Sequence, residues 1–227
     1  MKILVILLTF YTLIVANAWE LQKEADSIKV FTKNIEDSDY LAYRGVTIID
    51  GSVSALVAIL YDTERAPEWL QDCSFGMTLE EITFENNYIF ETYSLPFPFT
   101  DRQLIIHSQL TYDGKNARLE SVEANTFCLN REDTRCREVK EMNLVVVSRS
   151  RGHYELTYLA PYKTRVIWEQ HIESGGSLPT WLVNTSMVDI PFNSLKRLQI
   201  LVKDPRYKNQ TMNSIRSAWQ VSYDRHH

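Results

Sequence analysis

The stretch GGSLPTWLVN, residues 175–184, joins a run of strand character to a run with helical spacing. Gly175 and Gly176 can take positive φ at little steric cost, so the chain can turn sharply away from the strand. Pro179 suits the first turn of a helix, because the amide hydrogen that it lacks would have no helical partner there. The stretch therefore predicts a hinge at the glycines followed by a helix start, with Trp181 as a large apolar anchor.

The helix that begins at this junction is expected to run from about Pro179 to Val202. Its apolar residues fall at helical intervals and form one stripe; they are Trp181, Val188, Phe192, Leu195, Leu198 and Val202. Pro191 lies inside the helix, removes one backbone hydrogen bond and is expected to bend it. A helix with such a stripe can close an apolar cavity.

Upstream of the junction, alternating apolar and polar residues predict a long antiparallel meander. The expected strands are 77–85, 87–95, 102–112, 117–128, 140–150, 153–160 and 164–173, with a turn at Arg151-Gly152 among those that separate them. Two earlier strands are expected at 28–35 and 40–50, after a short amphipathic helix over 19–28 and before two short helices within 52–74.

An antiparallel sheet of about nine strands cannot stay flat, because strand twist accumulates until one face closes around something. The long C-terminal helix is the element expected to occupy the concave face of the sheet. We therefore expect an α+β fold in which a curved sheet wraps around that helix and leaves an internal apolar cavity. The sequence shows no internal repeat and no linker, and the length suits one domain over residues 19–227.

The first residues predict a secretory signal over 1–18. Lys2 precedes an apolar run over 3–15, and Ala16-Asn17-Ala18 matches the small-x-small pattern of a cleavage site. The alternative is an uncleaved anchor, but about 20 apolar residues are needed to cross a bilayer. A secreted or periplasmic protein is expected.

Charge and motifs argue against several functional classes. The formal net charge of −5 disfavours a general attraction to nucleic acid, so no nucleic-acid partner is expected. The chain lacks the common hydrolase, zinc-protease, P-loop and dinucleotide motifs. His107, His153 and His171 fall on three different predicted strands without metal-ligand spacing. We expect no catalytic residue, no metal and no cofactor.

Three cysteines are present for a compartment expected to be oxidising. Cys128 and Cys136 bracket a polar stretch, and a disulfide between them would contribute about 2 to 3 kcal/mol in the chain-entropy model. Two unpaired thiols are the alternative. Cys73 is expected to be a buried, unreactive thiol, because no cysteine-hydrolase pattern accompanies it.

Four motifs, in this order and spacing, resemble the START family (steroidogenic-acute-regulatory-related lipid transfer), including its bacterial members. They are EWLQDCS at 68–74, LPFPFTDRQ at 95–103, GGSLPTWLVN at 175–184 and DIPFNSLKRLQ at 189–199. Members of this family bind one lipid, often a sterol or phospholipid, inside a helix-grip cavity. The resemblance implies the same fold and the same class of ligand here, bound by a chain expected to be a monomer.

The resemblance also implies which residues meet the ligand. Many members have an acidic residue after the loop arginine, whereas Gln103 follows Arg102 here. Arg102 should therefore meet Asp101, Glu91 or a lipid head group, because a buried guanidinium without a partner is costly. A surface arginine that caps the loop is the alternative. The expected ligand-binding set is Arg102, Glu91, Asp101, Trp181, Val188, Phe192 and Leu195.

The loop and the helix start together are expected to form a gate. Phe97 and Phe99 lie on a proline-stiffened loop, where they can contact a membrane transiently or pack on the helix. The remaining gate residues are Gly175, Gly176, Pro179 and Pro191. Two other functions stay open, an enzyme of the helix-grip superfamily, cyclase/aromatase or hydrolase-like, and a ligand-free interaction module.

Overall fold

The structure is a computed structural model that describes residues 18–226, so nearly all of the predicted signal segment lies outside it. Ten strands form one antiparallel sheet in the order β1-β2-β3-β10-β9-β7-β6-β5-β4, with β8 added to β6 in parallel. Their bounds are β1 Glu20–Ala25, β2 Ile28–Lys33, β3 Ala42–Ile49, β4 Cys73–Thr83, β5 Asn86–Tyr93, β6 Arg102–Tyr112, β7 Ala117–Glu123, β8 Val145–Val146, β9 Arg149–Ala160 and β10 Lys163–Glu173.

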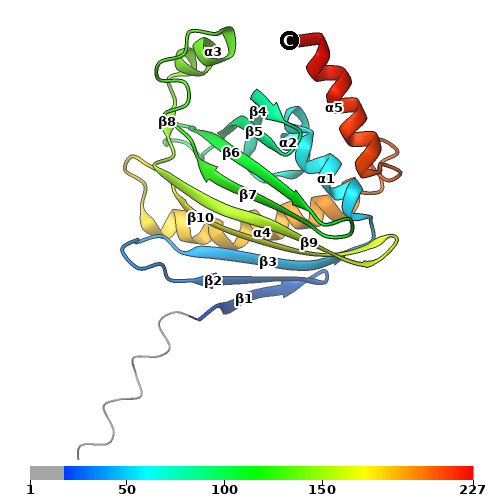
Figure 1. The fold of residues 1–227 in the computed structure, drawn as a ribbon. Helices are drawn as coiled ribbons and strands as arrows, with labels where there is room; N and C mark the ends of the chain where they lie inside the picture. Colours follow the sequence, from blue (N-terminus) through cyan, green and yellow to red (C-terminus); the bar gives the residue numbers. More distant parts are fainter. Residues whose placement is uncertain (1–17, 227) are drawn as a thin grey trace, which may run out of the picture.

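The sheet curls around the long helix α4, which lies on its concave face (Figure 1). The helices are α1 Val53–Tyr61, α2 Ala66–Trp69, α3 Thr134–Met142, α4 Thr180–Leu201 and α5 Met212–His226, and a short 3-10 turn, η2, covers Thr63–Arg65. The predicted α+β helix-grip architecture is confirmed.

The C-terminal half of α4 is anchored in the main core. Phe192, Leu195 and Leu198 are all buried there, where α4 packs against β2, β3 and α2. Gly45 on β3 permits this close packing, since a Cβ at that position would lie 2.6 Å from Cδ1 of Leu195. The hydroxyl of Ser194 also accepts a hydrogen bond from the backbone amide of Gln71, which ties α4 to the end of α2.

The N-terminal segment differs from the sequence prediction. Residues 19–28 form β1 and the start of β2 instead of a helix. Asp26 and Ser27 both have positive φ, at 50° and 61°, and make a tight hairpin turn between the two strands. Pairing with the neighbouring strand therefore outweighs the helical spacing of a few apolar residues.

The region 117–150 also differs from the expected pair of strands. β7 ends at Glu123, and α3 begins after Asp133, whose carboxylate accepts from the amide of Cys136 as an N-cap. The turn predicted at Arg151-Gly152 does not exist, because β9 continues through it and pairs Gly152 with Gln170 on β10.

Helix α5 was not expected from the sequence. It lies after α4 and packs Ile215 and Trp219 against the core, with Trp219 at 6.1 Å from the ring of Phe84. Arg216 pairs with Glu85 at 2.7 Å beside this contact. The C-terminal residues therefore cover the β4–β5 hairpin.

We predict that Leu195→Ala destabilises the domain by about 2 to 5 kcal/mol, because it leaves a cavity in a fully buried part of the core. Trp181→Ala on the same helix is the matched control. Trp181 is 70% exposed, so its loss should cost less than about 1 kcal/mol. Urea unfolding followed by circular dichroism measures both values, and equal losses would contradict this description of α4.

Candidate functional site

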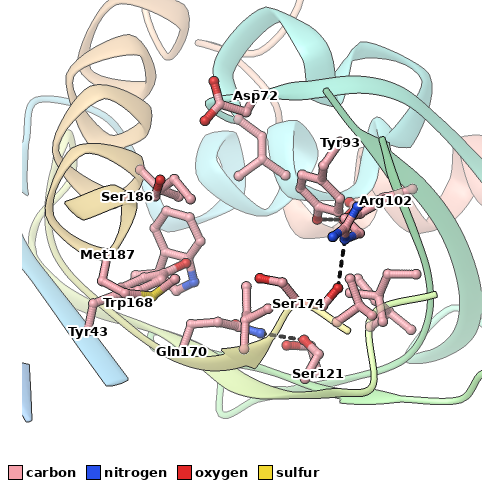
Figure 2. A pocket seen from close by; sticks show the side chains of 18 of the residues that line it. Tyr43, Asp72, Tyr93, Arg102, Ser121, Trp168, Gln170, Ser174, Ser186 and Met187 are labelled. Atoms are coloured by element: carbon pink, nitrogen blue, oxygen red, sulfur yellow. Dashed lines mark hydrogen bonds between the residues drawn. The ribbon is translucent and has the colours of Figure 1, made fainter. Parts of the chain in front are cut away.

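A cavity of about 160 Å³ lies between the sheet and the N-terminal half of α4. Most of its lining is apolar, and α2 and the loop before β6 also contribute to its wall. Figure 2 shows labelled side chains that surround it from opposite sides, with Arg102 and Ser174 on one side and Tyr43, Trp168 and Met187 on the other. The cavity is thus a predominantly apolar space with a few polar groups in its wall.

Arg102 is the buried cation of this wall, with 5% of its surface exposed. Its Nε donates to the carbonyl of Ser174 at 2.8 Å and one terminal nitrogen donates to the carbonyl of Gly175 at 3.2 Å, while the other donates to Thr100. Burial lowers the pKa of Arg102, but a guanidinium stays protonated in proteins. A fixed positive charge is therefore held by neutral backbone carbonyls.

Neither of the two carboxylates that were named as alternative partners of Arg102 pairs with it, and the third alternative, a lipid head group, stays a prediction. Asp101 accepts from the backbone amide of Leu95 at 2.9 Å and closes the loop. Glu91 lines the cavity and accepts from the hydroxyl of Tyr93. Burial raises the pKa of Glu91, which favours its neutral form. Among residues 18–226, no carboxylate forms an ion pair with Arg102.

The glycine hinge is the partner of Arg102. Gly175 and Gly176 have φ values of 65° and 62°, which glycine adopts readily. A Cβ on Gly175 would lie 2.2 Å from the carbonyl oxygen of Val146, so β8 passes directly beside the hinge. Two sequence motifs, the 95–103 loop and the 175–184 stretch, therefore meet at one set of hydrogen bonds.

Helix α4 presents a different face to the cavity from the one that the sequence predicted. The apolar stripe was expected to line it, but Trp181 is 70% exposed, and Phe192 and Leu195 are buried in the core below. Val188 lines a separate pocket with Leu41 and Asn184. The residues of this segment that line the cavity are Leu178, Leu182, Val183, Ser186, Met187 and Ile190.

This correction has a simple geometric cause. Both sets of α4 residues have helical spacing, and successive residues of a helix are rotated by about 100°. The spacing therefore predicts a valid apolar stripe without showing which stripe of α4 faces the cavity. The side-chain amide of Asn184, from the Trp-Leu-x-Asn motif, fixes the rotation of this half, since its oxygen accepts from the amide of Leu41 at 3.1 Å.

The aromatic residues of the 95–103 loop differ in exposure. Phe97 is 97% exposed, whereas Phe99 is partly buried. Trp181, at the start of α4, is the other strongly exposed large aromatic residue of this part of the chain. Pro179 is the N-cap residue of α4, and Pro191 lies within the helix and is buried. Two apolar side chains of the predicted gate are therefore exposed at the surface, Phe97 from the 95–103 loop and Trp181 from the start of α4.

Cys128 and Cys136 form a disulfide in the structure. They belong to a small second core with Leu79, Phe90 and Ile105. No residue of that core lines the cavity, so the disulfide ties α3 to the turn region that follows β7, away from the site. Cys73 is a free, buried thiol whose pKa burial raises, which keeps it protonated and unreactive.

Metal sites and membrane-spanning helices are both absent among the described residues. Within residues 18–226, no group of histidine, cysteine and acidic side chains could hold a metal ion. His107 stacks on Tyr88 with ring centroids 4.7 Å apart and contacts Asn86 at 2.6 Å. In the same part of the chain, no helix has the length and apolar character needed to span a membrane.

Comparison with known proteins identifies the family to which this chain belongs. The START domain family model matches residues 13–206. The uncharacterized protein PA1579 of Pseudomonas aeruginosa is 30% identical over 186 residues, which cover 81% of this chain and 86% of that protein.

Solved structures share the fold. A STAR-related lipid transfer protein from Xanthomonas axonopodis superposes with a TM-score of 0.71 at 24% identity, over 82% of this chain and 99% of that chain. Human STARD10 gives 0.67 at 14% identity, over 92% and 78%. Since the family model spans most of the sequence and includes both the arginine loop and the glycine hinge, the chain belongs to the START domain family.

Proposed function

We propose that this protein is a lipid carrier that holds one lipid in the cavity beside α4, with the lipid head group at Arg102. The observation that carries the proposal is a largely apolar cavity whose wall contains one buried cation without a carboxylate partner. A guanidinium has five N–H donors, and three hydrogen bonds from Arg102 to the protein are formed. The remaining N–H groups are available to a phosphate, carboxylate or hydroxyl of a ligand.

The residues that line the cavity favour lipid binding and transport over catalysis. The described lining residues include no histidine, lysine or cysteine, and the acidic and basic side chains among them are Asp72, Glu91 and Arg102. Glu91 is already bonded to Tyr93. An apolar space of this kind selects for a hydrophobic molecule and offers few groups for acid–base chemistry.

A lipid can enter a cavity of this size only if parts of the protein move. Pockets that enclose drug-sized ligands measure roughly 300 to 1,000 Å³, and this cavity measures about 160 Å³. We therefore propose that the 95–103 loop and the N-terminal half of α4 separate to admit a lipid, and that Phe97 and Trp181 contact the membrane during exchange. Their exposure supports this role, because exposed aromatic side chains suit a membrane interface.

Arg102→Met should reduce lipid loading while the domain stays folded. Charge-assisted hydrogen bonds contribute about 1.5 to 3 kcal/mol, so affinity should fall by about tenfold or more. Arg118→Met, a change at a partly exposed arginine outside the cavity, is the matched control. Mass spectrometry of lipids extracted from natively purified protein measures the loading. An empty wild-type protein would contradict the carrier function, and equal loading of a folded Arg102→Met protein would contradict the role of Arg102.

A disulfide engineered between the 95–103 loop and the first turn of α4 should stop lipid exchange while it retains lipid already bound. The two positions should be chosen with Cα atoms about 5.5 Å apart. Transfer of a fluorescent phospholipid between vesicles measures exchange, with the reduced form of the same variant and wild-type protein under both conditions as controls. A protein shown to be cross-linked that still exchanges lipid at the unlocked rate would rule out this gate.

We also propose that the protein is secreted or periplasmic. The Cys128–Cys136 disulfide supports this location, because disulfides persist in oxidising compartments. The intact mass of protein recovered from the producing cells should correspond to a chain that begins at Trp19. Thiol counting after denaturation without reductant should find one free cysteine, Cys73. A chain that retains its first 18 residues, with three free thiols, would argue against export.

A further inference from the structure

The inner end of the cavity contains polar atoms that have no hydrogen-bond partner. Oη of Tyr43 and the indole nitrogens of Trp69 and Trp168 are buried and unpartnered among the described residues. All three side chains line the cavity, and they are 0%, 5% and 4% exposed. Leaving a buried donor unsatisfied costs about 1 to 3 kcal/mol, and such groups are few in native proteins. Three of them in one place therefore require an explanation.

These three side chains form one cluster. Trp168 lies 5.0 Å from Tyr43 and 6.5 Å from Trp69, measured between ring centroids. Tyr154 stacks on Trp168 at 4.9 Å. Figure 2 shows Tyr43 and Trp168 extending from the sheet beside Met187, on the side of the cavity away from Arg102. The unpartnered donors thus gather at one end of the space.

A row of polar residues leads across the sheet to this cluster. Strand register pairs Ser108 with Ser121, then Gly152, Gln170 and Tyr43 on the successive strands β7, β9, β10 and β3. Directly paired residues share one face of a sheet, and the four members with side chains all line the cavity. Ser108 is 3% exposed, and its side-chain hydroxyl forms no hydrogen bond to another described residue. It adds one more unused hydroxyl.

This polar row is far from Arg102. Ser108 and Arg102 both lie on β6, and both line the cavity. They are six residues apart in the sequence, which corresponds to roughly 20 Å at about 3.3 Å per strand residue. Leu104 and Ile106 lie between them on the same face. Along β6, Arg102 and Ser108 are therefore separated by apolar lining residues, while Glu91, which pairs with Leu104 on the neighbouring strand β5, is already bonded to Tyr93.

The unused groups at the inner end are hydrogen-bond donors. An indole nitrogen donates only, and burial raises the pKa of Tyr43 well above its usual value, so its hydroxyl keeps its proton. The complementary group is an oxygen acceptor.

We propose that the inner end is a second ligand subsite, where Tyr43, Trp69 and Trp168 bind a hydroxyl or carbonyl oxygen at the far end of a lipid whose head group lies at Arg102. This inference rests on the proposed carrier function and deepens it. It specifies the ligand class as an amphiphile with oxygen functions at both ends of an apolar body.

The test uses two probes that differ in one hydroxyl, palmitate and ω-hydroxypalmitate, titrated calorimetrically into delipidated protein. Both carry a carboxylate for Arg102. Wild-type protein should bind ω-hydroxypalmitate several-fold to about tenfold more tightly, the value of one buried hydrogen bond. Tyr43→Phe should remove most of that preference and leave palmitate affinity unchanged.

Tyr61→Phe is the matched control. Tyr61 also has a buried, unpartnered hydroxyl, but it does not line the cavity. This variant should retain the full preference for the hydroxylated probe. A second measurement separates binding from folding: lipid-free Tyr43→Phe should melt at the wild-type temperature or above it, because its hydroxyl has no protein partner.

Three outcomes would overturn the inference. Palmitate binding without any preference for ω-hydroxypalmitate removes the subsite and leaves the carrier function intact. A strong loss of stability in lipid-free Tyr43→Phe assigns the hydroxyl to the fold. A wild-type protein that binds neither probe and carries no lipid after native purification contradicts the carrier function, and the subsite with it.

Discussion

The geometry of the site depends on one contact, between the buried guanidinium of Arg102 and the backbone carbonyls of the hinge. The carbonyls belong to Ser174 and Gly175, which follow Arg102 by 72 and 73 residues. A buried guanidinium is costly without partners, so these segments hold one another in place. The hinge can keep this position because Gly175 and Gly176 take positive φ. The direction in which α4 leaves the sheet, and hence the space beside it, follows from this contact.

The two halves of α4 have different roles because they are held differently. Leu195 packs against Gly45, and Ser194 accepts from the amide of Gln71, so the C-terminal half belongs to the core. The N-terminal half faces the cavity through side chains such as Met187, where the space is not filled. Pro191 lies between the halves and cannot donate to the carbonyl of Met187. In the proposed exchange, the N-terminal half of α4 is the part that moves, while the C-terminal half stays in the core.

The polar groups of the cavity wall are of two kinds, those that are paired within the protein and those that keep unused donors. Arg102 keeps a positive charge near the hinge, while Glu91 is bonded to Tyr93 and favours its neutral form. At the other end, Tyr43 and Trp168 keep donors that the protein does not satisfy. Natural cores rarely leave such groups unpaired. The protein thus accepts a loss of folding free energy in its interior, which is the expected signature of a site that another molecule completes.

The sequence by itself determined the helix-grip fold, most of the strands of the meander and the hinge, because alternation, helical spacing and glycine–proline chemistry act over short ranges. It also singled out Arg102 and Glu91, which line the cavity. Only the tertiary structure decided which stripe of α4 faces the cavity, because two stripes have helical spacing and Asn184 selects between them through Leu41. Only the tertiary structure likewise decided that residues 20–25 form strand β1 and that backbone carbonyls are the partners of Arg102. Strand pairing and backbone acceptors come from residues distant in the sequence, and a local pattern carries no information about them.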